Sequence, residues 1–128
     1  MNMSFNWKLY VDLADELASY KTNNHLQEAC LRSSISRGYY GVYCTARNFL
    51  IRQGNSIPKA DSHKYVREEY QKSQDWRRKK IAKNLRRLLN ERKDADYENS
   101  SNIDVKRVQI ALSICRQTLA VLHQIGAN

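Results

Sequence analysis

The stretch from His25 to Gln53 constrains the fold more than any other part of the sequence, because it has the pattern of one long amphipathic helix. Its apolar positions recur three or four residues apart, and the pattern stops at Gly54, a residue typical of helix ends. The apolar stripe consists of Leu31, Ile35, Tyr39, Val42, Ala46, Phe49 and Leu50. A helix this long must pack against several others to bury its stripe, so the pattern indicates an all-α protein.

The remaining sequence agrees with this fold class. The chain of 128 residues has four Gly and one Pro, too few for the many turns of a β-sandwich or barrel. Helical spacing predicts further helices at about residues 7–21, 62–73, 75–97 and 102–126, with a break at Thr22, Asn23 and Asn24 and a loop from Gly54 to Asp61 that contains Pro58. We therefore expect residues 1–128 to form a single helical domain, an up-and-down bundle of four main helices plus one short helix.

The long helix also carries a ridge of small residues beside its apolar stripe. Ser34, Gly38, Gly41 and Thr45 follow one another at spacings of four, three and four. Each interior glycine costs a helix about 1 kcal/mol relative to alanine, so a packing reason is expected for two of them. We expect the ridge to admit a closely packed backbone, and we expect a homodimer formed through this ridge or through the last helix.

Positive charge is concentrated in one segment. The chain has 22 Lys and Arg against 13 Asp and Glu, a formal charge of +9, and residues 64–93 hold twelve of these bases against four acids. On the helix expected over 75–97 the bases form an outward face, which predicts contact with phosphates or with an acidic partner. The candidate nucleic-acid-binding residues are Lys79, Lys80, Lys83, Arg86 and Arg87.

One base lies on the other side of that helix. Arg92 falls within about 20° of Ile81, in the middle of the apolar stripe, when residues are placed 100° apart. Asp96 lies one turn further on and can pair with it. The pair either closes the helix end or holds an arginine rigidly for phosphate binding or oxyanion stabilisation, with Tyr97 as a neighbouring phenol. Arg92, Asp96 and Tyr97 are therefore candidate catalytic residues.

Other candidates carry weaker signals. His63 begins the short helix, and histidine is the usual acid or base near neutral pH, so His63 is a further catalytic candidate. Arg37, Tyr40 and Arg47 lie on the less apolar flank of the long helix, where they line a cleft or partner surface, or are simply solvated.

No pattern in the chain indicates a cofactor or a metal. Cys30, Cys44 and Cys115 are widely spaced, without a metal-binding arrangement, and are expected to act as small buried hydrophobic residues. No apolar run approaches the roughly 20 residues that span a bilayer, and the first residues lack the pattern of a secretory signal. We expect a cytoplasmic protein without membrane contact.

Three motifs in order resemble the HEPN (higher eukaryote and prokaryote nucleotide-binding) domain superfamily, in particular its small bacterial and archaeal branch. They are the stretch ACLRSSISRGYYGVYCTARNFLI over 29–51, the SHK of 62–64 and the LLNERKDADY of 88–97, followed by a last apolar helix. The resemblance covers about residues 7–125. It implies a helical bundle, usually a homodimer with a cleft between protomers.

The resemblance also implies a function. Many HEPN proteins are metal-independent ribonucleases, often the toxins of toxin–antitoxin or phage-defence modules that include a minimal nucleotidyltransferase. Their motif arginine corresponds to Arg92, and their motif histidine would fall at Tyr97, Glu98 or Asn99, none of which is histidine. General acid–base catalysis would then depend on Tyr97, whose ordinary pKa near 10 is poorly matched, or on His63. In some relatives the partner enzyme attaches a nucleotide to a tyrosine near the motif, a role that Tyr97 could fill here.

Two functions therefore remain open. The first is a toxin-like RNase, or a degenerate form of one, which if active is a metal-independent endoribonuclease that binds RNA. The second is a non-catalytic module that binds a nucleotide or a partner such as a nucleotidyltransferase antitoxin. Binding of duplex DNA through a helix-turn-helix is less favoured, because the bases follow a whole helix face.

Overall fold

The structure is a computed structural model that describes residues 5–21 and 24–127 of the chain. Over these residues it contains five α-helices and no strand, which confirms the predicted all-α bundle. The helices are α1 (Leu9–Ser19), α2 (Asn24–Arg52), α3 (Ser62–Gln71), α4 (Trp76–Tyr97) and α5 (Val105–Gln124). Of the predicted break, Thr22 and Asn23 lie outside the described residues, whereas Asn24 is the first residue of α2.

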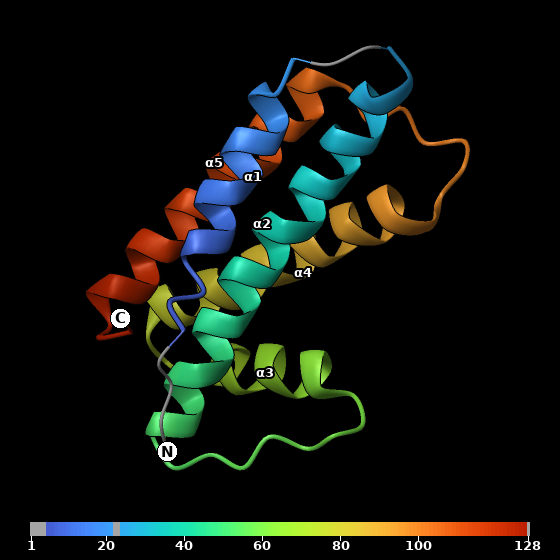
Figure 1. The fold of residues 1–128 in the computed structure, drawn as a ribbon. Coiled ribbons are helices and arrows are strands. Elements are labelled where there is room, and N and C mark those ends of the chain that lie inside the picture. Colours follow the sequence, from blue (N-terminus) through green and yellow to red (C-terminus); the bar gives the residue numbers. More distant parts are fainter. Residues whose placement is uncertain (1–4, 22–23, 128) are drawn as a thin grey trace.

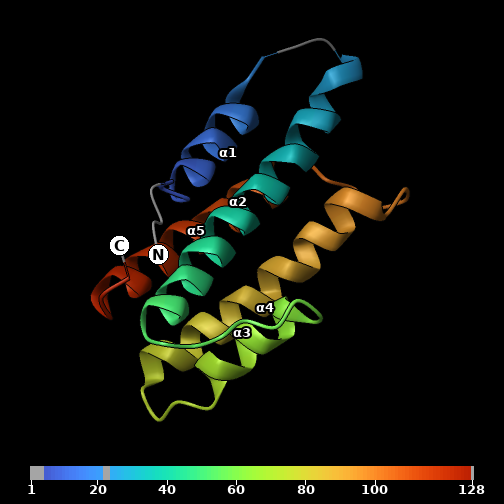
Figure 2. The same cartoon turned by 60° about the horizontal axis from the view of Figure 1, so that its bottom comes forward.

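The four longer helices alternate in direction along the bundle, and α3 crosses one end of it (Figure 1). The long helix α2 is central and packs against each of the other helices. Rotation of the view shows α3 lying along the first turns of α4 (Figure 2). This crossing brings the middle of α2, the start of α3 and the last turns of α4 to one face of the molecule.

The core follows the predicted apolar stripes. All seven residues of the α2 stripe are buried, and so is the core face predicted for α4, which comprises Ile81, Leu85, Leu88, Leu89 and Ala95. Cys44 and Cys115 are buried among these side chains, whereas Cys30 is half-buried. In the described residues, none of the helices is both long and apolar enough to cross a membrane.

Helix ends follow sequence signals that can be recognised. The side chains of Asp75 and Asp104 accept backbone hydrogen bonds from Arg77 and Arg107, and so cap the first turns of α4 and α5. Asp61, directly before α3, adopts a left-handed backbone with φ of 55°, a conformation that is uncommon for a residue other than glycine. This turn at Asp61 directs the chain into α3, whose second residue is His63.

The small-residue ridge of α2 packs against α1 and α5 of the same chain. The Ser34 hydroxyl donates to the backbone oxygen of Ala14 in α1 at 2.7 Å. A Cβ atom on Gly41 would meet Val11 at 2.8 Å, and one on Gly38 would meet Cys115 at 3.0 Å. The expected close approach is therefore confirmed, but the ridge as a dimer face is wrong, because helices of the same chain cover it.

Candidate functional site

A pocket of about 540 Å³ opens where α3 meets the later turns of α4, and it brings two of the predicted site residues together. His63 and Arg92, which are far apart in sequence, both line it. The complete lining is Lys59, Asp61, Ser62, His63, Lys64, Arg67, Leu89, Arg92 and Lys93. Five Lys or Arg side chains against a single Asp give this pocket, which we call the His63 pocket, a strongly positive potential.

Two tyrosines of α2 hold the ring of His63. The Tyr39 hydroxyl and Nδ1 of His63 lie 2.5 Å apart, and the Tyr43 ring stacks on the imidazole with centroids 4.0 Å apart and planes within 8°. Tyr40 meets the same imidazole edge-on at 6.1 Å. The imidazole is therefore positioned by the core helix and not only by its own helix.

The surroundings of His63 favour a neutral imidazole. Burial, followed by the positive charges of Arg92 and Arg67, lowers the pKa of His63 below its ordinary value of 6.5. Burial also raises the pKa of Tyr39 well above its usual range, so this phenol keeps its proton. The imidazole tautomer sets the direction of the bond to Nδ1, and when the Tyr39 hydroxyl donates to this nitrogen its buried proton has an acceptor. The imidazole proton then lies on Nε2, as a donor that no described residue accepts.

Arg92 is half-buried and held on several sides, as its place on the apolar stripe predicted. Its side chain is 16 % exposed, and its guanidinium lies over the rings of Tyr40 and Tyr97 at 5.2 and 5.6 Å. Nε donates to the Asp96 carboxylate at 2.9 Å, and Nη2 donates to the Tyr97 hydroxyl at 3.4 Å. Among the described residues Nη1 of Arg92 has no hydrogen-bond partner.

The last turn of α4 is anchored to α2 by contacts that residue spacing does not predict. The Ser36 hydroxyl donates a hydrogen bond of 3.3 Å to Oδ2 of Asp96, the same oxygen that accepts the hydrogen bond from Nε of Arg92. Arg32 donates to the backbone oxygens of Ala95 and Ser101, at 2.9 and 3.0 Å. These contacts fix the helix end that carries Arg92, Asp96 and Tyr97, so the three predicted residues do form one cluster.

The trio of Arg37, Tyr40 and Arg47 does not form one cleft. Tyr40 belongs to the cluster around Arg92 and His63. In contrast, Arg37 lies over the Tyr10 ring of α1 at 5.4 Å. Arg47 lies over the Trp7 ring and the Tyr43 ring, each at 5.9 Å, so it borders the His63 cluster as well as the residues just before α1.

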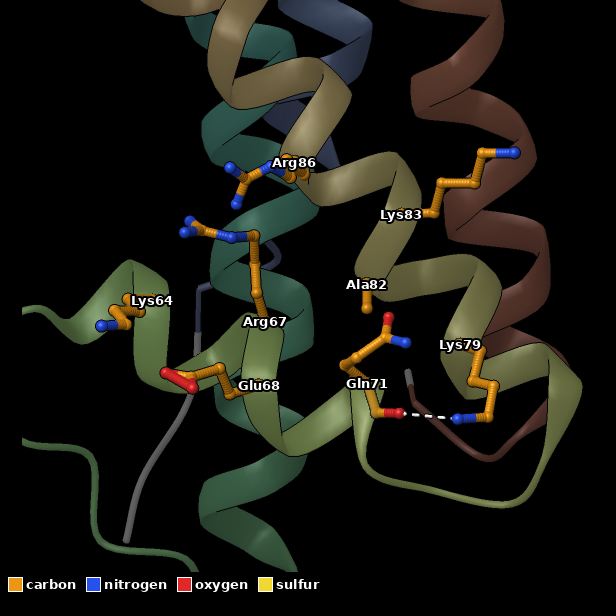
Figure 3. Close-up of a pocket in the computed structure, with 8 residues that line it drawn as sticks. All are labelled: Lys64, Arg67, Glu68, Gln71, Lys79, Ala82, Lys83 and Arg86. Carbon is orange, nitrogen blue, oxygen red and sulfur yellow. Dashed lines mark hydrogen bonds between the residues drawn. The ribbon is translucent and has the colours of Figure 1, made fainter.

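The five predicted nucleic-acid-binding residues of α4 are all exposed, but the structure divides them between two surfaces. Lys80 and Arg87 lie on the side toward α5. Arg86 lies in a groove of about 590 Å³ between α3 and α4, while Lys79 and Lys83 line both surfaces. Figure 3 shows this α3–α4 groove, which is lined by Lys64, Arg67, Glu68, Gln71, Lys79, Ala82, Lys83 and Arg86.

Sequence reasoning missed Arg67, Tyr39 and Tyr43 as site residues. Arg67 follows His63 by four residues, which places the two on one face of α3, and this spacing could have singled it out. Tyr39 was assigned to the core, and it is indeed buried. A buried tyrosine needs a partner for its hydroxyl, but only the packing of α3 on α2 identifies that partner as His63.

The arrangement combines a neutral imidazole, a restrained arginine and further bases around an open pocket. Such a site can bind a phosphate group and can donate a proton to it from Nε2. The part of the chain that the structure describes holds no group of three or more His, Cys, Asp or Glu residues able to bind a metal ion. No family model matches the chain, and no curated protein or solved structure matches it, so these groups and the three motifs are the basis for any assignment.

Proposed function

We propose that this chain is a HEPN-like, RNA-directed protein whose His63 pocket is a metal-independent endoribonuclease site, and that it serves as the toxin-like component of a toxin–antitoxin or defence module. The observation that carries the proposal is that His63 and Arg92 line one pocket. In this proposal His63, supplied by α3, performs the task of the histidine that is missing after Arg92.

The proposed reaction is transesterification of an RNA phosphodiester. The ribose 2′-oxygen attacks the phosphorus, and the bond from phosphorus to the 5′-oxygen breaks. His63 donates its Nε2 proton to the departing 5′-oxygen, the 2′-hydroxyl proton passes to water, and Arg92 stabilises the additional negative charge on the phosphoryl oxygens. The products are a 2′,3′-cyclic phosphate and a 5′-hydroxyl end.

The electrostatics of the His63 pocket suit a site that responds to its substrate. The surrounding bases lower the pKa of His63, so the resting imidazole is neutral near pH 7. A bound phosphodiester compensates these positive charges and raises the pKa of His63, because a nearby anion favours the charged imidazolium. The added proton lies on Nδ1, so in this state the Tyr39 hydroxyl accepts from Nδ1, and the imidazolium that forms when RNA is bound is the general acid at Nε2.

The test is an RNA cleavage assay with a chelator present. We expect wild-type protein to cleave single-stranded RNA, and His63→Gln and Arg92→Ala each to lower the rate by about 100-fold or more. His123→Gln and Arg87→Ala are matched controls, because both residues are exposed and neither lines the pocket. A substrate with 2′-deoxyribose at the cleaved position must resist cleavage.

The outcomes separate the roles of the residues. Cleavage that survives both His63→Gln and Arg92→Ala overturns the proposal. Tyr97→Phe should retain activity, and a loss comparable to that of His63→Gln would transfer the proton donation to Tyr97.

Tyr97 supports a second candidate function, as the acceptor of a nucleotide transferred by a partner nucleotidyltransferase. Its side chain is 69 % exposed, so a partner enzyme could reach the hydroxyl that Arg92 contacts. Mass spectrometry of the protein expressed with its neighbouring genes tests this function. A nucleotidyl adduct that is present on the wild-type protein and absent from Tyr97→Phe would support the hypothesis that Tyr97 accepts a nucleotide. An unmodified Tyr97 would count against this hypothesis.

We also propose that the protein is a homodimer. Because α1 covers the small-residue ridge, the last helix remains the candidate interface, and Val105 and Ile110 of α5 are exposed apolar residues that support it. Light scattering during size-exclusion chromatography tests the oligomeric state. A dimer that becomes monomeric on Ile110→Glu supports this interface.

A further inference from the structure

The α3–α4 groove holds positive charge that the protein itself does not neutralise. Five of its lining residues are Lys or Arg and one is Glu. Of these bases, Lys79 donates to the backbone oxygen of Gln71 at 2.9 Å, and none forms an ion pair with a described residue. The groove therefore has the electrostatic character of a site for anions.

Arg67 gives this groove its most specific feature. Nη1 of Arg67 is buried from solvent and has no hydrogen-bond partner among the described residues. A buried donor without a partner is unfavourable, and more so when it belongs to a charged group. Figure 3 shows the guanidinium groups of Arg67 and Arg86 directed to the same end of the groove, with Lys64 on the α3 side. An anion bound between these two guanidinium groups would offset their positive charges.

The groove adjoins the His63 pocket. Lys64 and Arg67 line both, so the two cavities lie side by side at these two side chains of α3. A ligand with a single phosphate fills only one of them. A ligand with several phosphates at regular intervals, such as a nucleic acid strand, can occupy both at once.

We infer that the α3–α4 groove binds backbone phosphates of a single RNA strand, with Arg67 and Arg86 holding one phosphate between them. An adjacent phosphodiester of the same strand occupies the His63 pocket. The inference rests on the proposed function for the identity of the strand. A single strand is the fitting occupant, because a positively charged groove that follows the backbone is the usual way in which proteins hold unpaired strands. Arg86, Lys79 and Lys83 then contact RNA from the groove, whereas Lys80 and Arg87, on the side toward α5, do not.

Binding of an RNA that cannot be cleaved separates this inference from catalysis. The probe is a fluorescent single-stranded RNA of about 12 nucleotides with a 2′-O-methyl group on every ribose. Arg86→Ala and Arg87→Ala form a matched pair, because these neighbours are both exposed and remove the same charge from different sides of α4. We expect Arg86→Ala to weaken binding about tenfold, and to lower the slope of log Kd against log salt concentration by about 0.7, while Arg87→Ala changes Kd less than about twofold.

A second ligand and a second variant complete the design. A 2′-O-methyl dinucleotide has one phosphate, so Arg86→Ala should leave its affinity unchanged. Arg67→Met should weaken the binding of both ligands, since Arg67 lines both cavities, and a thermal melt of each variant establishes that it is folded.

Each outcome decides the inference. Equal losses for Arg86→Ala and Arg87→Ala would mean that RNA responds only to net charge, and would overturn it. If Arg86→Ala weakened the binding of free ATP but left RNA binding unchanged, the groove would be a nucleotide site, and the inference would also be overturned. Selective loss for Arg86→Ala without any cleavage by the wild-type protein would sustain the groove and refute the ribonuclease. If cleavage depended on His63 but Arg86→Ala and Arg87→Ala weakened RNA binding equally, the ribonuclease proposal would stand and the groove inference would be refuted.

Discussion

The Tyr39 hydroxyl and Nδ1 of His63 form a hydrogen bond of 2.5 Å, which joins the core of α2 to the first turn of α3. Tyr39 is only 1 % exposed, so packing of the core fixes the position of its hydroxyl. The imidazole that it holds lines an open, positively charged pocket. The protonation of His63 therefore depends both on the fold and on the bases around the pocket.

Replacement of Arg92 by glutamine should raise the pKa of His63. Burial is the largest cause of the lowered pKa and is retained in this variant, but the charge of Arg92 is the next largest cause and is lost. Proton NMR titration of the imidazole resonances measures this pKa. The chain has three histidines, and His63→Gln identifies the resonance that belongs to His63.

Arg87→Gln is the control for this titration, because it removes the same charge from an exposed position outside the pocket. Its His63 resonance should titrate as in the wild-type protein. An unchanged His63 pKa in Arg92→Gln would show that the guanidinium does not act on the imidazole.

The lowered pKa of His63 also predicts how stability depends on pH. The unfolded chain takes up a proton on this residue near pH 6.5, whereas the folded chain does so only at lower pH. The free energy of unfolding should therefore fall as the pH drops from about 6.5 through the folded pKa, and His63→Gln should remove this contribution. Urea denaturation at several pH values measures the difference, and parallel pH profiles for the two proteins would contradict the prediction.

Helical periodicity was sufficient to predict most of the fold. The apolar residues of the α2 stripe are spaced three or four positions apart, which places them on one face of the helix. That face turns toward the core, and each of its residues is buried. The same reasoning on α4 placed Arg92 on the core side with Asp96 as its partner, since both lie on one helix and their separation is local. Local geometry of this kind can be read directly from residue spacing.

Contacts between helices could not be predicted in the same way. His63 and Arg92 share a pocket because α3 crosses the end of the bundle, and no periodicity within either helix encodes that crossing. The glycine ridge shows the same limit. Spacing predicted close packing on Gly38 and Gly41, but not that α5 and α1 of the same chain would supply it.

Gly41→Ala should destabilise the protein, although alanine is the better helix former. Its Cβ would lie 2.8 Å from a Val11 methyl carbon and 3.1 Å from the backbone oxygen of Trp7, so α1 must move. We expect a net loss of about 1–2 kcal/mol, because overpacking exceeds the gain of about 1 kcal/mol in helix propensity. Chemical denaturation measures this loss.

Ser33→Ala, at an exposed position of the same helix, is the control and should change the free energy of unfolding by less than about 0.5 kcal/mol. A Gly41→Ala protein as stable as the wild type would mean that α1 does not pack tightly on the ridge.

Asp96→Ala and Asp94→Ala distinguish positioning of Arg92 from a general effect of charge. Both acids lie on α4 in ion pairs, Asp96 with Arg92 at 2.9 Å and Asp94 with Arg107 at 2.6 Å. Each substitution removes one negative charge, so a general electrostatic effect would make both proteins bind RNA slightly more tightly. We expect this result for Asp94→Ala alone, because its arginine keeps Glu91 as a partner at 2.7 Å and lies outside the pocket.

Asp96→Ala should instead weaken RNA binding or slow cleavage by about tenfold or more, because Arg92 loses the carboxylate that holds its Nε, and small displacements of a phosphate-binding group are costly. Its effect on the free energy of unfolding should stay below about 1 kcal/mol, as is usual for an ion pair near the surface. Anisotropy titration with single-stranded RNA, together with a thermal melt, measures both quantities. The two variants differ in the sign of the expected change in affinity, so a gain in affinity for both would leave Arg92 without a positioned role at the site.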